Sequence, residues 1–390
     1  MLVIGLMSGT SMDGITAALV EIKELELEEG VELKLIVKLV ELETYPYPPK
    51  LKRQLLSLGE GGTVRELCCM DVYLGELFAE AALKVMEKAG KSGEEIDLIG
   101  SHGQTICHLP RGLTGFRFST PSTLQLGELD VIAERTGITT IGDFRPKDLA
   151  AGGEGAPLIP YADYHLFYDS ERHRVILNIG GIANITYLPA GAEVNEIIAF
   201  DTGPGNMIID GVLRRLTGDV QAYDANGEIA AKGRVNQELL QELMKHPFIS
   251  RQPPKSTGRE EFGEGFLTQL MERARSLRLS DEDLVATVTA FTAEAIAENC
   301  QRFLDKIDEL IIGGGGAHNR TLLRMLKEKL EGVHVTTTQT YGIPVEAKEA
   351  LGFAILAYQA LHQRANSVPR ATGAKHPLVL GKISWGRPKE

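Results

Sequence analysis

The chain has 390 residues, of which 43% are hydrophobic and 24% are charged, and its formal net charge is −12 at pH 7. A globular protein of this length and composition can form two hydrophobic cores. The negative charge and the lack of a Lys/Arg-rich stripe in the sequence argue against nucleic acid or an anionic membrane surface as partner. The composition favours a small soluble substrate instead.

The start of the chain lacks the basic segment of a signal peptide, and no apolar run approaches the length that spans a membrane. We therefore expect a cytoplasmic protein without a membrane partner. The four cysteines, which lack the spacing of a zinc site and are expected to be buried free thiols, are Cys68, Cys69, Cys107 and Cys300.

A glycine-rich turn between two predicted strands, over residues 1–7 and 15–20, is the first candidate site. The turn consists of Gly9, Thr10, Ser11, Met12, Asp13 and Gly14. Its glycines lack the Cβ atom that would block close approach of a ligand, its hydroxyl groups are donors, and its aspartate can hold a cation. The turn suits a metal-bound polyphosphate, and the alternative is an ordinary hairpin turn.

The rest of the first half predicts an α/β domain. An alternating run over residues 31–42, after a turn at Glu29–Gly30, extends the strand pair into a meander. Thr63 and Glu66 form a capping box at the start of a helix that is expected to end before Gly90. The elements that follow form a parallel unit: a strand over residues 96–100, a helix over 126–135 and a strand over 138–141.

Polar residues follow both of these parallel strands: His102 and Gln104 follow the first, and Asp143 and Arg145 follow the second. Ligands of such sheets bind beyond the carboxyl ends of the strands, so we expect a substrate site here. Arg145 is expected to share a strand face with Asp143. The alternatives are a turn-stabilising role for Asp143, a surface ion pair for Arg145, and hydrogen bonding within the protein for His102 and Gln104.

The same order of patterns recurs in the second half. The expected elements are a strand, glycine turn and strand over residues 174–188, a strand over 197–200, a helix from Ser280 to about residue 307, a strand over 308–312, a helix over 320–330, a strand over 333–337 and a helix over 345–361. This repeat predicts a duplicated α/β domain. The first copy is expected over residues 1–168, the second over 169–366, and a C-terminal tail over 367–390, which is expected to fray from Lys382.

Two such domains, each with a phosphate turn facing a shared nucleotide cleft, describe the ribonuclease H-like fold of actin, sugar kinases and acetate kinase. The first turn would grip the phosphates from one side, and Asp201–Gly203 or Asn178–Asn184 from the other. The turn at Gly313–Asn319 would seat the nucleoside. The nucleotide-binding residues expected in the second half are Asn184, Asp201, Thr202, Gly203, Gly314, Gly315, Gly316 and Asn319.

Asp13 and Asp201 are the candidate magnesium ligands. Both would act partly through water, because magnesium keeps several water ligands at phosphate sites. Each aspartate could instead stabilise its own turn.

Nine short motifs span nearly the whole chain: Met7–Gly14, Ser101–Thr105, Gly142–Arg145, Ala150–Gly153, Gly155–Leu158, Asn178–Asn184, Asp201–Asn206, Ser256–Glu260 and Gly314–Asn319. Together they resemble the anhydro-N-acetylmuramic acid kinase family. The resemblance implies an ATP- and magnesium-dependent enzyme of peptidoglycan recycling. Such an enzyme phosphorylates the 6-hydroxyl of 1,6-anhydro-N-acetylmuramic acid while water opens the anhydro bridge, which gives N-acetylmuramic acid 6-phosphate.

The resemblance also implies roles for individual residues. ATP would lie on Gly9–Gly14, Asp143 would be the general base that takes a proton from water, and Glu349 would lie near the sugar. The alternative for Glu349 is an exposed position on an amphipathic helix. Arg145 could bind the lactyl carboxylate, and His102 and Gln104 the hydroxyl or acetamido groups. A homodimer is implied as well.

Four positions depart from the usual family pattern: Thr16, Glu154, Glu261 and Ala347 stand where aspartate, glutamine, phenylalanine and tryptophan are often found. Because the expected base and phosphate turn are retained, these departures bear on the contacts to the sugar more than on the reaction. Two other functions remain open. One is a kinase of the same fold for another amino sugar, and the other is a non-catalytic actin-like nucleotide switch.

Overall fold

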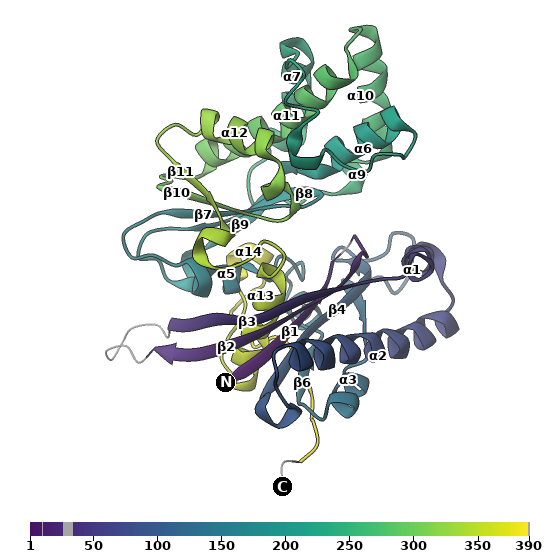
Figure 1. Cartoon of the computed structure of the whole chain (residues 1–390), viewed down its shortest axis with the longest axis vertical. Coiled ribbons are helices and arrows are strands. Elements are labelled where there is room, and N and C mark those ends of the chain that lie inside the picture. The colour runs from purple at the N-terminus through teal and green to yellow at the C-terminus, as the bar shows by residue number, and fades with distance from the viewer. Residues whose placement is uncertain (10, 26–33, 389–390) are drawn as a thin grey trace. The chain divides into compact units, whose positions relative to one another are not determined.

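The computed structural model describes residues 1–9, 11–25 and 34–388. Thr10 and the turn expected at Glu29–Gly30 lie outside the described residues. The chain forms two compact units, one from residues 1–166, 193–195 and 346–390 and the other from residues 167–192 and 196–345. Each unit contains its own β-sheet (Figure 1).

The sheet of the first unit has the strand order β12-β6-β4-β1-β2-β3, and β5 pairs with β4. β1 runs parallel to β4 and antiparallel to β2, β6 is parallel to β4, and β12 is antiparallel to β6. The strands are β1 (Leu2–Ser8), β2 (Gly14–Leu25), β3 (Lys34–Pro46), β4 (Leu98–Leu109), β5 (Ser122–Leu126), β6 (Thr140–Gly142) and β12 (Lys382–Ser384).

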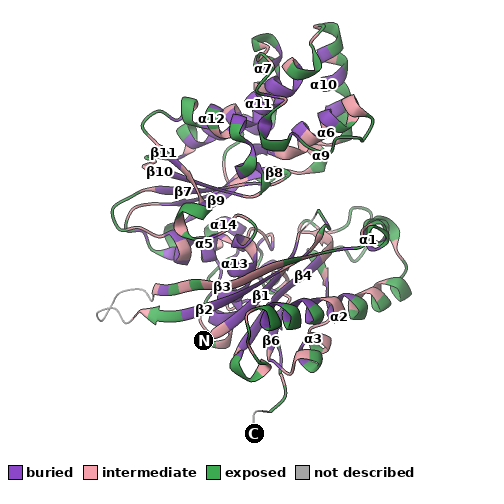
Figure 2. Cartoon of the chain, viewed as in Figure 1, coloured by how far each residue is buried: buried purple, intermediate pink, exposed green. Residues whose placement is uncertain are grey.

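Helices cover both faces of this sheet. On one face, Ile4 and Leu6 of β1 share a core with Phe78 of α2 (Val64–Lys88). Because side chains alternate along a strand, Gly5 faces the other side, where an added Cβ would lie 1.8 Å from the carbonyl oxygen of Ala350 in α13 (Lys348–Leu361). The strand can therefore pack closely against α13, most of which is buried (Figure 2). The other helical segments of this unit are α1 (Pro49–Gly61), η1 (Gly93–Glu95), α3 (Leu129–Thr136), α4 (Arg145–Ala150), α5 (Pro160–Phe167), whose last residue enters the second unit, and α14 (Pro369–Thr372).

The second unit repeats this arrangement. Its sheet has the order β11-β10-β7-β8-β9, which matches β6-β4-β1-β2-β3 strand for strand and direction for direction. The strands are β7 (Arg174–Ile179), β8 (Ile182–Leu188), β9 (Ile198–Pro204), β10 (Glu309–Gly313) and β11 (His334–Thr337). The repeat confirms the predicted α/β fold of duplicated ribonuclease H-like domains.

The helices of the second unit are more numerous than the sequence patterns indicate. They are α6 (Asn206–Thr217), α7 (Gln237–Met244), α8 (Pro247–Ser250), α9 (Arg259–Phe262), α10 (Glu264–Ser276), α11 (Asp281–Phe303) and α12 (Arg320–Lys329), with the short turns η3 (Ala225–Gly227), η4 (Gly315–His318) and η5 (Thr338–Tyr341). The turn η2 (Val194–Glu196) is divided between the units, with its first two residues in the first unit and Glu196 in the second. α11 starts as predicted after Ser280, whose side chain accepts a hydrogen bond from the N–H of Asp283.

Several sequence predictions need correction. The strand expected over residues 96–100 continues as β4 to Leu109, because β5 pairs with its second half and Gly103 adopts a left-handed backbone (φ +72°) where the ladder is irregular. Residue 145 begins α4, so Arg145 does not share a strand face with Asp143. Among the cysteines only Cys300 is buried; Cys68 and Cys69 lie on the exposed part of α2.

The C-terminal segment also differs from expectation. The sequence pattern predicts that residues 345–366 belong to the second domain and that residues 367–390 form a tail. In the structure, residues 346–390 belong to the first unit, because α13 packs on β1 and β4 and because β12 pairs with β6. The predicted capping box of Thr63 and Glu66 and the left-handed Gly90 after α2 are confirmed.

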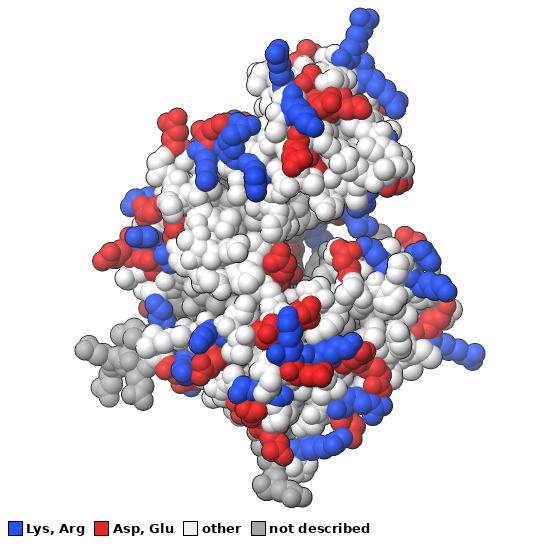
Figure 3. Space-filling view, viewed as in Figure 1, with Lys and Arg blue, Asp and Glu red and all other residues white. Residues whose placement is uncertain are grey.

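The surface carries both signs of charge. Lys and Arg side chains alternate with Asp and Glu over the viewed face (Figure 3). Arg273, for example, forms ion pairs with Glu238 and Glu242. No helix among the described residues is long and apolar enough to cross a membrane.

Candidate active site

Buried polar side chains hold the first glycine turn in place through hydrogen bonds. Ser8, at the end of β1, has its Oγ 2.7 Å from both the Gly14 carbonyl oxygen and Oε1 of Gln104. The Gln104 amide nitrogen donates to the carbonyl oxygen of Gly9 (3.1 Å). Gln104 is fully buried. Its side chain therefore positions the turn, which supports the alternative in which it bonds within the protein.

The two glycines of this turn have different surroundings. An added Cβ at Gly14 would lie 2.3 Å from the carbonyl oxygen of Tyr45, so the pairing with β3 requires glycine there. An added Cβ at Gly9 would meet nothing closer than Ser11 Oγ at 4.0 Å. Packing among the described residues therefore does not require Gly9, and its open side leaves room for a ligand. Asp13, with its side chain largely exposed, forms an ion pair with Lys52.

His102 and Arg145 form a hydrogen-bonded pair beyond this turn. Arg145 Nε donates to His102 Nε2 (3.0 Å), so the ring proton of neutral His102 lies on Nδ1 and is donated to the Gly103 carbonyl oxygen (2.9 Å). Burial, together with the Arg145 charge, lowers the pKa of His102 to about 3 and keeps the ring neutral. Arg145 Nη1 also donates to the carbonyl oxygen of Gly155 (2.8 Å). His102 therefore orients the guanidinium group.

Glu349 joins this pair from the first turn of α13. Its side chain is half-buried, and burial raises the pKa of its carboxyl group, while the Lys348 and Arg145 charges lower it. The neighbouring Lys348 forms a buried ion pair with Asp163 (2.9 Å), which fixes the start of α13. The structure thus brings Glu349 and Arg145 together in a half-buried setting, which differs from an exposed position on an amphipathic helix.

Asp143 lies where β6 ends, with a left-handed backbone (φ +53°) that is unusual for a residue other than glycine. It follows Gly142, which pairs with Ser101, the residue before His102. Its carboxylate forms an ion pair with Lys382 of β12. The Asp143 side chain keeps 28% of its surface exposed, so water and substrate can reach it.

Sequence reasoning missed two charged residues near Asp143. Lys382 lies in the segment that was expected to fray, and no local pattern marked its pairing with β6. Asp71 lies in the middle of α2, where its carboxylate accepts the N–H of Gly127 (2.7 Å). Burial raises the pKa of Asp71, and the charges of Glu128 and Asp143 raise it further. Helical periodicity alone gave no reason to separate Asp71 from the solvated face of the helix.

In the second unit, Asp201 lies within β9 opposite Asn184 of β8, rather than in the turn after the strand. Asp201 Oδ2 accepts the N–H of Thr257 (2.9 Å), and its own N–H donates to the Lys255 carbonyl oxygen (3.1 Å). The motif Ser256–Glu260 therefore orients this carboxylate. Thr202 is fully buried, and its hydroxyl donates to the Ala183 carbonyl oxygen (3.1 Å), so it is used within the fold.

Lys255 anchors this segment. Its ammonium group donates to the carbonyl oxygens of Phe248 and Ile249 (both 3.1 Å) and lies over the Phe248 ring, 4.7 Å from the centroid. Burial, together with the charge of the neighbouring Arg251, lowers the pKa of Lys255 to about 8.

The second glycine turn packs against the end of β7. Gly314 has φ +75°, and an added Cβ there would lie 2.7 Å from the Ile179 carbonyl oxygen. At Gly316 an added Cβ would lie 2.3 Å from the Ile179 side chain, whereas at Gly315 the nearest atom is 3.7 Å away. Asn319 caps α12 by accepting the N–H of Leu322 (2.9 Å). Gly315 is therefore less tightly packed than Gly314 and Gly316, and the Asn319 side chain is held by its helix.

No group of three or more His, Cys, Asp or Glu residues that could hold a metal ion occurs among the described residues. Asp13 lies in the first unit and Asp201 in the second. Single carboxylates of this kind fit magnesium, whose other ligands at such sites are phosphate oxygens and water.

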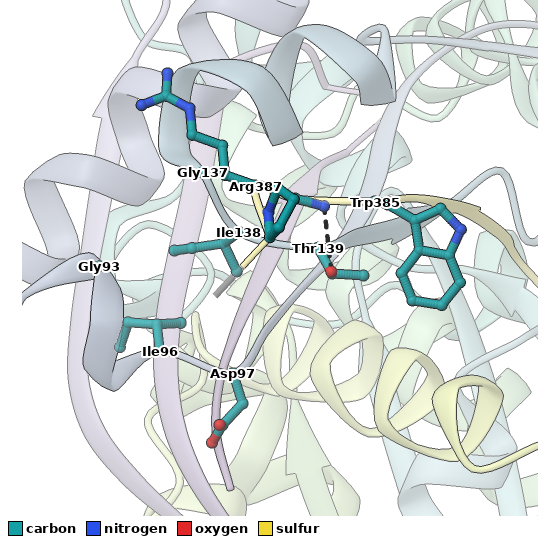
Figure 4. Close-up of a pocket in the computed structure, with 10 residues that line it drawn as sticks. Gly93, Ile96, Asp97, Gly137, Ile138, Thr139, Trp385 and Arg387 are labelled. Atoms are coloured by element: carbon teal, nitrogen blue, oxygen red, sulfur yellow. Dashed lines mark hydrogen bonds between the residues drawn. The ribbon is translucent and has the colours of Figure 1, made fainter. Parts of the chain in front are cut away.

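A surface pocket of about 420 Å³ in the first unit contains none of the predicted site residues (Figure 4). Asp97, which precedes β4, and Thr139, which precedes β6, line it together with Trp385 and Arg387. The Gly386 N–H donates to Thr139 Oγ1 (3.2 Å). The pocket therefore lies at the amino ends of these strands, whereas His102 lies within β4 and Asp143 follows the carboxyl end of β6.

Comparison with known proteins places the chain in a family. The sequence profile described as anhydro-N-acetylmuramic acid kinase matches residues 1–386. A protein of that name from Caldanaerobacter subterraneus subsp. tengcongensis is 49% identical over 388 residues, which cover 98% of this chain and 96% of that protein. Another, from Bacillus thuringiensis subsp. konkukian, is 46% identical, with 99% of both chains covered.

Among solved structures, component A of the (R)-2-hydroxyglutaryl-CoA dehydratase of Acidaminococcus fermentans covers 92% of this chain and 98% of its own, with a TM-score of 0.47 and 16% identity. A ROK hexokinase from Thermus thermophilus covers 93% of this chain and 99% of its own, with a TM-score of 0.37 and 16% identity. The profile match and the identity to full-length relatives establish that the chain belongs to the anhydro-N-acetylmuramic acid kinase family.

Proposed function

We propose that this chain is an ATP- and magnesium-dependent kinase that opens 1,6-anhydro-N-acetylmuramic acid with water and phosphorylates its 6-hydroxyl. The product is N-acetylmuramic acid 6-phosphate, and the reaction belongs to peptidoglycan recycling. The observation that carries the proposal is the position of Asp143, a partly exposed carboxylate at the end of β6, on the strand next to the one that carries His102. Membership of the family favours this activity over a kinase for another amino sugar or a non-catalytic switch.

Asp143 is the general base of the reaction. It takes a proton from the water whose oxygen attacks the anomeric carbon. The bond between that carbon and the bridging oxygen breaks, and the bridging oxygen becomes the 6-oxygen that accepts the γ-phosphoryl group of ATP. ADP leaves. Lys382 holds the Asp143 carboxylate before substrate enters.

Arg145 and Glu349 bind the sugar. Arg145 Nε and Nη1 are occupied by His102 and Gly155, and Nη2 has no hydrogen-bond partner among the described residues. That nitrogen can donate to the lactyl carboxylate. The Glu349 carboxylate accepts a hydrogen bond from a sugar hydroxyl group. His102 acts through Arg145, since both of its ring nitrogens are already engaged.

The glycine turns at Gly9–Gly14 and Gly314–Gly316 bind ATP, and Asp13 and Asp201 would hold magnesium partly through water. Magnesium supplies charge neutralisation on the phosphates. The proposal includes a homodimer, as the family resemblance implies, and a cytoplasmic location, where ATP is available. Sedimentation velocity tests the dimer directly.

The substrate is tested by measuring ADP release with magnesium ATP and 1,6-anhydro-N-acetylmuramic acid, N-acetylglucosamine or no sugar. The proposal requires release that depends on the anhydro sugar. Faster release with N-acetylglucosamine would favour the amino-sugar kinase, and sugar-independent turnover would favour the nucleotide switch.

A matched pair of glycine variants tests the phosphate turn. An added Cβ would meet nothing closer than 4.0 Å at Gly9 and nothing within 4 Å at Gly265. Gly9→Ala should raise KM for ATP because the new methyl group meets the phosphates, and Gly265→Ala on α10 should not. Equal KM values for the two variants would contradict the placement of ATP.

A further inference from the structure

One flank of α6 faces the glycine turn that would seat the nucleoside. The apolar side of this helix, with Ile208, Ile209, Val212 and Leu213, is buried. Asn206, Asp210 and Arg214 recur every four residues and therefore share a different side of the helix. This side begins at Asn206, immediately after β9.

Asn206 ties that flank to the turn. Its Nδ2 donates to the Ile179 carbonyl oxygen (3.3 Å). An added Cβ at Gly316 would lie 3.3 Å from Asn206 Oδ1, and one at Gly315 would lie 3.7 Å from Asn206 Nδ2. Asp210 is one helical turn further along, about 6 Å by helix geometry, and thus within one sugar ring of the glycine turn.

Asp210 also lies near the segment before η3, because the Asp224 charge acts on its carboxyl group. Asp224, just before η3, accepts the N–H groups of Ile229 (2.9 Å) and Ala230 (3.0 Å), so its carboxylate is already used. Gly227 packs against Asn319, where an added Cβ would lie 2.2 Å from Oδ1. η3 and η4 are therefore neighbours, and Asp210 lies close enough to Asp224 for that charge to raise its pKa.

Asp210 itself has no hydrogen-bond or ion-pair partner within the part of the chain that the structure describes, although it is half-buried. Burial, together with the Asp224 charge and against the Arg214 charge, raises its pKa to about 6. An ionised carboxylate is an acceptor only, so the complementary ligand group carries hydroxyl or N–H donors. Beside a glycine turn that seats a nucleoside, the vicinal hydroxyls of ribose supply two such donors.

We propose that Asp210 binds the 2′- and 3′-hydroxyls of the nucleotide ribose and makes the enzyme select ribonucleotides over deoxyribonucleotides. The inference rests on the proposed function in one respect, namely that the turn Gly314–Gly316 binds the nucleotide. Asp210 is a specificity-determining residue, and its role does not depend on which sugar is phosphorylated.

The test compares ATP, 2′-deoxy-ATP and 3′-deoxy-ATP as substrates of the wild type and of Asp210→Asn. A hydrogen bond to a charged group predicts that the wild type prefers ATP by about tenfold or more in kcat/KM. In Asp210→Asn, kcat/KM for ATP should fall to that for the deoxy nucleotides, while the values for the deoxy nucleotides change little. The control is Glu272→Gln, at an exposed position of α10 in the same unit, which should keep the wild-type preference for ATP.

Two results would overturn the proposal. The first is a wild type that uses ATP and both deoxy nucleotides equally, which needs no variant. The second is an Asp210→Asn enzyme that loses the same factor with all three nucleotides, since that pattern indicates a structural role.

Calorimetric binding of ADP and 2′-deoxy-ADP separates this inference from the proposed function. Discrimination in binding by the wild type, lost in Asp210→Asn, supports the role of Asp210 even if no anhydro sugar is phosphorylated. Phosphorylation of the anhydro sugar without nucleotide discrimination refutes the role of Asp210 and leaves the kinase activity standing.

Discussion

The ammonium group of Lys382 forms an ion pair with the carboxylate of Asp143. Lys382 opens β12, where it pairs with Gly142, the last residue of β6 and the neighbour of Asp143 in the chain. The last strand of the protein therefore reaches the proposed general base. The C-terminal segment therefore contacts the candidate active site, although no local pattern in it indicates that role.

Lys382→Ala should lower kcat by about tenfold, or about 1.4 kcal/mol in activation free energy, because Asp143 loses the partner that holds its carboxylate. Lys382 is 70% exposed, so the free energy of unfolding should change by less than about 1 kcal/mol. Steady-state kinetics and urea unfolding measure the two effects. Arg387 lies on the same C-terminal segment and forms an exposed ion pair with Glu134 of α3. Arg387→Ala removes that pair and should leave kcat unchanged. A Lys382→Ala enzyme with wild-type kcat would contradict the role.

Arg145→Lys should raise KM for 1,6-anhydro-N-acetylmuramic acid by about tenfold, because lysine keeps the charge but loses the planar donor geometry. KM for 1,6-anhydro-N-acetylglucosamine, which lacks the lactyl carboxylate, should change much less. Kinetics with both sugars make the comparison, and Arg111→Lys at an exposed position is the control. An equal rise in KM for both sugars would show that Arg145 does not bind the lactyl carboxylate.

Lys348→Met should destabilise the first unit by about 3–5 kcal/mol, because it leaves the buried Asp163 without its ammonium partner. The double variant Lys348→Met with Asp163→Leu removes both charges and should recover much of that loss. Urea unfolding of the two single variants and the double variant gives the coupling energy. A loss below about 1 kcal/mol in Lys348→Met would mean that the pair contributes little to stability.

His102 should make stability depend on pH. Its pKa is about 3 in the folded protein and about 6.5 in the unfolded chain, so only the unfolded chain binds the proton between these values. Its contribution is complete above pH 6.5 and declines as pH falls, by up to about 1.4 kcal/mol per pH unit.

Urea unfolding between pH 7.5 and 5 measures this effect. The wild type should lose stability more steeply than His102→Asn, whereas His376→Asn, at an exposed position, should follow the wild type. Parallel curves for the wild type and His102→Asn would rule out a buried neutral histidine.

The fold was predictable where the signals are local. Alternation of apolar residues, the capping box at Thr63 and the recurrence of glycine turns gave the duplicated α/β domains. The assignment of α13 and β12 was not predictable in this way. Their place depends on Gly5 and Gly100 lying under α13 and on β12 pairing with β6, which are contacts between segments far apart in the sequence.

The candidate site likewise contains residues that local sequence signals indicate and residues that only tertiary packing reveals. Residue types and strand ends indicated Asp143, Arg145 and the glycine turns, because these positions follow from local chemistry. The inward roles of Gln104 and Thr202 were hidden, since a polar side chain at a strand end has the same sequence signature whether it faces ligand or protein. Asp71, Asp210 and Lys382 acquire their surroundings only from tertiary packing.

The proposed reaction depends above all on the activation by Asp143 of the water that opens the anhydro ring. The most direct test is the mass of the phosphosugar formed from 1,6-anhydro-N-acetylmuramic acid and magnesium ATP in water enriched in heavy oxygen, with the wild type and with Asp143→Asn. The account predicts a wild-type product with heavy oxygen at the anomeric position and a loss of at least about a hundredfold in rate for the variant. A phosphosugar without heavy oxygen, or an Asp143→Asn enzyme with wild-type rate, would contradict it.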